Sequence, residues 1–170
     1  SSIGGVGLVG IIGVAVLAPI IRNYLGGPGL SVLAASIILG IMILPTVMSI
    51  SMDAINAVPL SYKEGSLALG ATRWQTQYMV VLKAARNGIL AGVILGMGRA
   101  IGETMAVIMV AGNAVRMPTS VIDSVRTLTA NIALEMGYAV GRHRQALFAT
   151  GVVLFIAVML LNSIAMWTLK

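Results

Sequence analysis

Residues 30–52 read LSVLAASIILGIMILPTVMSISM and contain no charged side chain. A helix needs about 20 consecutive apolar residues to cross the hydrocarbon core of a bilayer, and this stretch meets that length. Lipid offers no hydrogen-bond partner to an open strand edge, so a bundle of helices is the expected form of such a chain. The stretch therefore predicts a membrane-spanning helix.

Three other stretches have the same character. Residues 1–21 and 145–169 carry no charge, and residues 88–112 are apolar except for Arg99 and Glu103. The sequence thus predicts four spans, at about residues 3–21, 30–52, 88–112 and 146–168. The absence of an initiating Met and of a basic leader favours a chain whose earlier spans are missing.

The composition excludes several classes of protein. Hydrophobic residues make up 58% of the chain and charged residues 9%, whereas soluble domains carry about 25% charged residues. The sequence has no Cys and therefore no disulfide framework. The net charge of +6 does not indicate nucleic-acid binding, because residues 53–86 and residues 113–145 carry four Lys or Arg each. Because the two segments carry equal numbers of Lys and Arg, the positive-inside rule does not predict which side of the membrane each segment faces.

The segment 53–86 predicts a short helix that needs a partner. Ser61-Tyr62-Lys63-Glu64 fits a capping box, and Gly70 suits a left-handed helix end. A helix over residues 61–69 is too short to be stable alone in water, so we expect it to dock onto another surface. Thr72-Arg73-Trp74-Gln75 offers a second capping box, which opens an amphipathic stretch at the membrane interface.

The segment 113–145 predicts one further helix. Asp123 or Ser124 is its expected N-cap, and its apolar face runs to Met136. The four Arg residues of this segment can raise the local concentration of an anion. The simpler alternative is a solvated loop that faces the lipid headgroups.

Arg99 and Glu103 are the charged residues expected inside a span. They lie four residues apart near the middle of residues 88–112, so one helical face would hold both. An Arg at that depth costs about 2.5–3.5 kcal/mol, and such residues usually face a bundle interior or a water-filled cavity. One interpretation is an ion pair that fixes helix register. The other is an anion path, in which Arg99 grips an oxyanion with its fork of N–H donors and Glu103 positions it or competes for it.

The same span carries Gly88, Gly92 and Gly96 at intervals of four residues. This spacing predicts a close helix–helix contact. The sequence shows no metal cluster, phosphate-cradling loop or nucleophile–base pair, and His143 is its only histidine. We therefore expect a chain that is not an enzyme, with any ATP site supplied by another chain.

Residues 64–83 resemble the EAA loop of ABC importer permeases. Glu64-Gly65-Ser66, Gly70, Val80 and Leu82 follow the pattern of that loop, and Lys83 stands where the family has proline. In the family this loop is cytoplasmic and its short helix docks in a groove of the ATPase subunit. The resemblance implies a coupling helix made of Glu64, Gly65, Ser66, Leu67, Ala68, Leu69 and Gly70.

A wider resemblance links the chain to the phosphate ABC transporter permeases of the C-type. Four motifs carry it: IMILPTVMSISMDAINAVP at 41–59, ALGATRWQ at 68–75, GMGRAIGETMAVIMVAGN at 96–113 and RTLTANIALEMG at 126–137. It implies an all-α polytopic membrane protein with the ABC type I importer permease fold, holding the last four of six spans in the cytoplasmic (inner) membrane. By resemblance, loop 53–86 is cytoplasmic, loop 113–145 is external, and Arg99 and Glu103 take part in phosphate translocation.

The partners follow from the same resemblance. It implies a second homologous permease, two ATPase subunits that use ATP, an external phosphate-binding protein and membrane lipid. No cofactor, metal or nucleic acid is expected on this chain. Three alternatives stay open: a permease for another oxyanion such as sulfate or molybdate, a passive anion channel, and a membrane-embedded enzyme.

Overall fold

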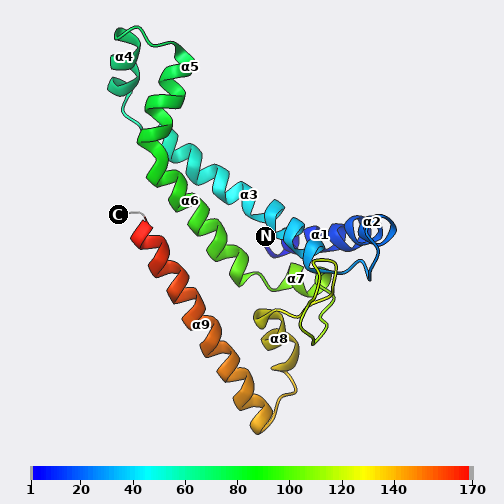
Figure 1. Cartoon of the computed structure of the whole chain (residues 1–170). Coiled ribbons are helices and arrows are strands. Elements are labelled where there is room, and N and C mark those ends of the chain that lie inside the picture. The colour runs from blue at the N-terminus through cyan, green and yellow to red at the C-terminus, as the bar shows by residue number, and fades with distance from the viewer. Residues whose placement is uncertain (1, 169–170) are drawn as a thin grey trace. The chain divides into compact units, whose positions relative to one another are not determined.

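The computed structural model describes residues 2–168, and every long element in that part of the chain is a helix (Figure 1). The elements are α1 Ser2–Ile12, η1 Gly13–Leu17, α2 Ala18–Tyr24, α3 Val32–Asn56, α4 Leu60–Ala68, α5 Arg73–Gln75, η2 Thr76–Val81, α6 Leu82–Gly102, α7 Met105–Val110, α8 Leu128–Glu135 and α9 Arg142–Thr168. Here η1 and η2 are π-helical turns.

Four helical stretches of the described chain are long and apolar enough to cross a membrane. They are Gly7–Tyr24, Val32–Asn56, Arg73–Gly102 and Arg142–Trp167. The fold is therefore that of an all-α membrane protein with four long apolar helices, as the sequence predicts.

The first compact unit comprises Ser1–Met42 and Arg99–Leu161. Its core joins Ile21 of α2, Ala34 and Ile38 of α3, and Ala106 and Val110 of α7, all of them at most 3% exposed. Helix α1 lies along α7 on the edge of this core (Figure 1). The core thus holds α7 in place directly after the apolar segment that contains Arg99.

Backbone contacts fasten the segment after α7 to the start of α3. The N–H of Val32 donates to the carbonyl of Asp123 at 3.1 Å, and Ser124 Oγ donates to the carbonyl of Leu30 at 2.6 Å. Gly112 makes this approach possible. It adopts φ +83°, and a Cβ there would lie 2.7 Å from the Ser124 Cβ.

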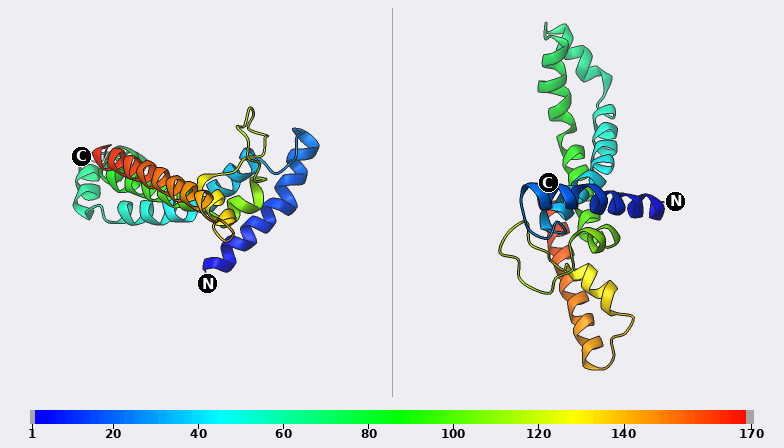
Figure 2. Two further views of the ribbon diagram at one scale, coloured as in Figure 1. Left: turned by 90° about the horizontal axis from the view of Figure 1, so that it is seen from below. Right: turned by 90° about the vertical axis from the view of Figure 1, so that its right-hand side faces the viewer.

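The second compact unit comprises Ile43–Gly98 and Asn162–Lys170. Within it, α3 and α6 run side by side in opposite directions (Figures 1 and 2). The predicted glycine contact is confirmed: Gly88 lies against Ala54, Gly92 against Ile50 and Gly96 against Val47. A Cβ on Gly96 would lie 2.7 Å from Val47 Cγ2, so a side chain larger than hydrogen would separate the two helices.

The short helix in this unit begins earlier than the sequence suggests. Helix α4 runs over Leu60–Ala68 rather than 61–69, and its N-cap is Pro59, at φ −57° and ψ 140°. No side chain caps it, so the predicted capping box of Ser61 and Glu64 is wrong. Proline fixes φ near a value that suits the start of a helix, so Pro59 sets where α4 begins.

The second predicted capping box is confirmed. Thr72 Oγ1 accepts the N–H of Gln75 at 3.3 Å, and Gln75 Oε1 accepts the N–H of Thr72 at 2.9 Å. Gly70, between the two helical starts, has φ +85° as expected for a left-handed helix end. From Thr72 the chain continues through α5 and η2 into α6 without leaving helix.

Two predicted boundaries differ from the structure. The expected span 88–112 consists of two helical pieces, because α6 ends at Gly102 and α7 begins at Met105. The expected caps Asp123 and Ser124 are also wrong. Helix α8 starts at Leu128, where Thr127 Oγ1 accepts the N–H of Ala130 at 3.3 Å.

Candidate functional site

The break between α6 and α7 lies in the segment where the sequence places its charged pair. Arg99 is in the last turn of α6, and Glu103 follows the end of that helix. The N–H of Glu103 donates to the carbonyl of Ala100 at 3.2 Å, which tightens the last turn. The expectation that Arg99 and Glu103 share one face of a continuous helix is therefore wrong.

Glu103 has a local structural function in this break. Its Oε1 accepts the N–H of Ala106 at 3.3 Å, within the first turn of α7. A carboxylate at that position satisfies an otherwise unpaired donor and complements the positive end of the helix. The side chain is half-buried, whereas Arg99 is exposed in the described chain.

The interruption between α6 and α7 leaves backbone N–H and C=O groups without helical partners inside an apolar segment. Backbone groups freed by the interruption need partners, and membrane proteins tolerate them where protein or a water-filled cavity surrounds them. Transporters place such interrupted helices around substrates, whose charges the free helix ends complement. Glu103 already engages the positive end of α7, so the Arg99 guanidinium is the group at this break that is suited to an anion. The roles of Arg99 and Glu103 in transport stay predictions.

The predicted coupling helix is the second candidate site. Residues 64–68 form the C-terminal half of α4, Leu69 is its C-cap, and Gly70 turns the chain back. The hydroxyls of Ser66 and Thr76 lie 3.0 Å apart, in contact between α4 and η2. One side of α4 is therefore fixed to the adjoining helix.

The other side of α4 is open. No residue of α4 is buried, and Leu60 and Leu69 are 65% and 90% exposed. A cavity of about 290 Å³ lies beside it, between side chains that include Glu64, Leu67 and Arg73. Exposed leucines next to a partly charged cavity are typical of a surface that receives a partner.

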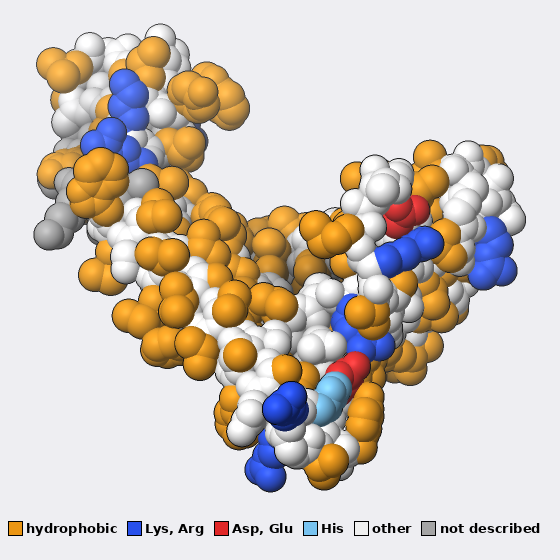
Figure 3. Space-filling view, turned by 60° about the horizontal axis from the view of Figure 1, so that its bottom comes forward, with side chains coloured by type: hydrophobic (Ala, Val, Ile, Leu, Met, Phe, Trp, Pro, Cys, Tyr) orange, Lys and Arg blue, Asp and Glu red, His pale blue; other side chains and the backbone are white. Residues whose placement is uncertain are grey.

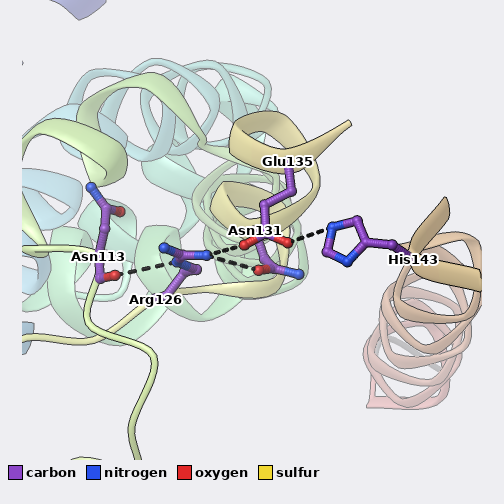
Figure 4. A network of polar contacts seen from close by, with 5 residues as sticks. All are labelled: Asn113, Arg126, Asn131, Glu135 and His143. Carbon is purple, nitrogen blue, oxygen red and sulfur yellow. Dashed lines mark hydrogen bonds and ion pairs between the residues drawn. The ribbon is translucent and has the colours of Figure 1, made fainter. Parts of the chain in front are cut away.

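A network of polar contacts that the sequence interpretation missed lies after α7 (Figure 4). Arg126 donates through Nε to the carbonyl of Asn113 at 3.2 Å, and through Nη1 to Asn131 Oδ1 at 3.3 Å and to Glu135 Oε1 at 2.5 Å. The second oxygen of Glu135 lies 2.9 Å from Nε2 of His143. The network joins the loop after α7, helix α8 and the first turn of α9.

On the face drawn in Figure 3, hydrophobic side chains are abundant and charged side chains form small separate groups. The most apolar 18 residues within Arg142–Trp167 have a mean hydropathy of 2.4, and only 6% of them are buried inside the chain. Such a helix needs lipid or another apolar partner to cover it. The charged groups are thus the places where chemistry other than lipid contact can occur.

Asp123 closes a turn on this loop, outside the four apolar helices. Its Oδ2 accepts the N–H of Thr119 at 2.9 Å, the Thr119 hydroxyl at 2.9 Å and the N–H of Ser120 at 3.0 Å. These hydrogen bonds lower the pKa of Asp123 below its usual value of 3.8, and the bond from the Thr119 N–H has the largest effect. The charge of Arg116 also lowers this pKa, whereas burial opposes the shift. Hydrogen bonds to the charged form have this effect because protonation would break them.

The turn at residues 119–123 is expected to depend on pH. Because the pKa of Asp123 is lower in the folded turn than in the unfolded chain, its contribution is complete above the usual value of 3.8 and is lost as pH falls through the lowered value. Amide exchange at Thr119 and Ser120 should therefore accelerate only in that acid range. In Asp123→Asn the same amides should exchange without an acid transition, and an unchanged transition in that variant would contradict the assignment.

Comparison with known proteins places this architecture among transport proteins. The family model described as binding-protein-dependent transport system inner membrane component matches residues 8–170. The chain is 46% identical over 150 residues to "Probable ABC transporter permease protein YqgH" of Bacillus subtilis strain 168. It is also 41% identical to two proteins named phosphate transport system permease protein PstC, over 140 residues for Xylella fastidiosa strain 9a5c and over 154 residues for Mesorhizobium japonicum.

These alignments cover most of this chain and less than half of each relative. They include 86%, 81% and 89% of this chain, and 48%, 43% and 47% of the respective relatives. The chain therefore spans about half the length of the curated proteins that it matches. No solved structure gives a significant match.

Proposed function

Because this chain belongs to the family of binding-protein-dependent transport system inner membrane components, we propose that it is part of the permease of an ATP-driven importer of inorganic phosphate. The observation that carries the proposal is the 41% identity to proteins named as phosphate transport permeases, which extends over more than four fifths of the chain. The Arg99 guanidinium in the last turn of α6 supports an anionic substrate.

In this proposal Arg99 holds the phosphate during its passage. A guanidinium presents a planar fork of N–H donors that matches two oxygens of a phosphate. Glu103 fixes the start of α7 through the N–H of Ala106, and its negative charge limits how tightly an anion is held nearby. The site then binds phosphate strongly enough to admit it and weakly enough to release it.

Helix α4 connects this site to the energy source in the proposed transporter. Two ATPase subunits hydrolyse ATP, and one of them receives α4 with its exposed leucines. The loop 53–86 is then cytoplasmic and the loop 113–145 faces an external phosphate-binding protein. A second homologous permease completes the pathway in the cytoplasmic membrane.

Uptake competition tests the substrate. Membrane vesicles with the complete transporter should accumulate labelled phosphate only with ATP and the binding protein, and unlabelled phosphate should compete far better than sulfate or molybdate. Competition by sulfate or molybdate at equal concentration would assign the permease to another oxyanion. Accumulation to the same level without ATP would indicate a passive anion channel.

Glu64→Lys is expected to uncouple ATP hydrolysis from transport. Glu64 lies beside Lys63 and Arg73 at the cavity of α4, so a third positive charge changes the surface that the ATPase would meet. We expect phosphate uptake to fall about tenfold or more, the equivalent of about 1.4 kcal/mol of lost docking free energy, while ATP hydrolysis continues. The measurement is the ratio of phosphate transported to ATP hydrolysed.

Glu64→Gln is the matched control for this variant, because it keeps the size of the side chain and adds no positive charge. It should retain most of the coupling ratio. A normal ratio in Glu64→Lys at normal membrane abundance would remove α4 from the coupling pathway.

A further inference from the structure

The first compact unit holds a cavity of about 400 Å³ that contains neither Arg99 nor Glu103 among its lining residues. The loop after α7, the start of α8 and one residue of α9 line it, and it is open to the surface. Its polar side chains are Arg116, Arg126, Thr127, Asn131 and Thr150. Two of these are permanently cationic and none is acidic, so the wall of the cavity carries positive charge.

Several N–H donors of this wall are unused within the described residues. Arg126 donates through Nε and Nη1, and its Nη2 makes no hydrogen bond there. Asn131 accepts through Oδ1 while its amide nitrogen donates to no described residue. A concave site with unused donors from different segments is suited to a ligand with several acceptor oxygens.

The start of α8 adds to this preference. Thr127 and Leu128 line the cavity and lie at the N-terminus of that helix. The positive end of a helix stabilises an anion placed near its first turn. The helix end and the two guanidinium groups therefore favour the same sign of charge.

Glu135 offsets part of the charge of Arg126 through their ion pair, but it leaves part of the guanidinium available. It does not line the cavity, and its Oε1 engages only Nη1 of Arg126 while Oε2 faces His143. The carboxylate thus fixes the guanidinium in one orientation and leaves its other edge available. Asp123, which senses the charge of Arg116, also lies outside the cavity lining.

We propose that this cavity, here named the Arg116–Arg126 cavity, binds a tetrahedral oxyanion before it reaches the break at Glu103. The identity of that anion as inorganic phosphate rests on the proposed function. The cavity would receive the anion on the side of the loop 113–145, and Arg126 would position it against the donors of Asn131 and α8. A transient site of this kind raises the local substrate concentration at the entrance of the pathway.

Thiol labelling can test this proposal, because the chain contains no Cys. Ala114 lines the cavity, and Val140 is 78% exposed and does not line it. In the complete transporter, a charged thiol reagent would be applied to Ala114→Cys and Val140→Cys with increasing inorganic phosphate or with potassium chloride of equal ionic strength. Phosphate should slow labelling at position 114 in a saturable manner and leave position 140 unchanged.

Two further variants in the Ala114→Cys background identify the donors. Arg116→Gln should raise the phosphate concentration for half protection about tenfold, as expected for the loss of one charge-assisted contact. Asn131→Asp keeps the acceptor for Arg126 and adds a negative charge, so it should weaken protection at least as much. Arg142→Gln removes a cation that does not line the cavity, and it should leave the half-protection concentration unchanged.

Equal slowing by phosphate and potassium chloride, or full protection in both Arg116→Gln and Asn131→Asp, would overturn the proposal. Phosphate uptake measured on the same preparation separates this result from a failure of the proposed function. Normal phosphate uptake without protection rejects the cavity alone. Protection by sulfate in a transporter that accumulates sulfate rejects phosphate as the substrate and supports the cavity as an oxyanion site.

Discussion

Arg99→Gln is expected to abolish phosphate uptake while the transporter still assembles. Gln keeps a polar side chain of moderate length but loses the charge and the fork of donors that a phosphate needs. Hydrogen bonds to charged groups contribute about 1.5–3 kcal/mol each, so losing a pair of them should lower the rate of uptake by about a hundredfold or more. The measurement is initial phosphate uptake divided by the amount of the chain in the membrane.

Arg99→Lys provides the matched control. Lys retains the positive charge as a point charge without the planar fork, so we expect uptake between that of Arg99→Gln and that of the unmodified protein. Equal uptake by all three proteins would remove Arg99 from the substrate path. A loss of membrane abundance in Arg99→Gln alone would instead assign Arg99 a structural role.

Gly88→Ala is expected to destabilise the second compact unit, and Ala54→Gly is expected to restore it. A Cβ on Gly88 would overlap the Cβ of Ala54, and neither methyl group can rotate away. Overpacking of this kind costs about 1–3 kcal/mol. Removing the methyl at position 54 re-creates the space, so the double variant should recover most of the loss.

The measurement is the midpoint of thermal unfolding of the purified transporter for the two single variants and the double variant. Gly40→Ala is the control, because a Cβ at that helical position meets nothing within 4 Å and Ala favours helix over Gly. It should leave stability unchanged or slightly higher. Purely additive effects of the two substitutions at 54 and 88 would show that the two positions do not contact each other.

Features set by local chemistry could be predicted from the sequence. Thr72 and Gln75 form a capping box because both partners lie within one helical turn, and Gly70 takes a left-handed conformation that other residues resist. The spacing of Gly88, Gly92 and Gly96 indicated a close contact because the period of a helix brings these positions to one face. The length of the apolar stretches indicated membrane-spanning helices because a helix of about 20 apolar residues matches the thickness of the hydrocarbon core.

Features set by distant contacts could not be predicted. Gly102 precedes the break, but α6 contains other glycines that do not interrupt it, so glycine alone does not predict where the helix ends. Helix α7 is held by its packing against α1 and α3. Ser61 and Glu64 have the spacing of a capping box, but Pro59 starts the helix one residue earlier than predicted. Both signals predict a helix start within three residues of each other, and the sequence pattern does not show which of them the folded chain uses.

The candidate sites also differ in whether local sequence or distant contacts form them. Glu64 and its neighbours were found from a motif, and the structure places them together on one short exposed helix. Arg126, Glu135 and His143 have no helical spacing, and they meet because a loop and two helix ends converge (Figure 4). The charges of the segment 113–145 were visible in the sequence, but their pairing was not.

The polar network after α7 also bears on the order in which the chain acquires its structure during synthesis. All its members lie between Asn113 and His143, so the network can close as soon as the first turn of α9 has been made. Contacts between residues near in sequence form faster than contacts that close long loops. The core of the first compact unit is made earlier in the chain, but it joins Ile21 to Val110 and so closes a much longer loop. The polar network can therefore become ordered before the rest of α9 has been synthesised.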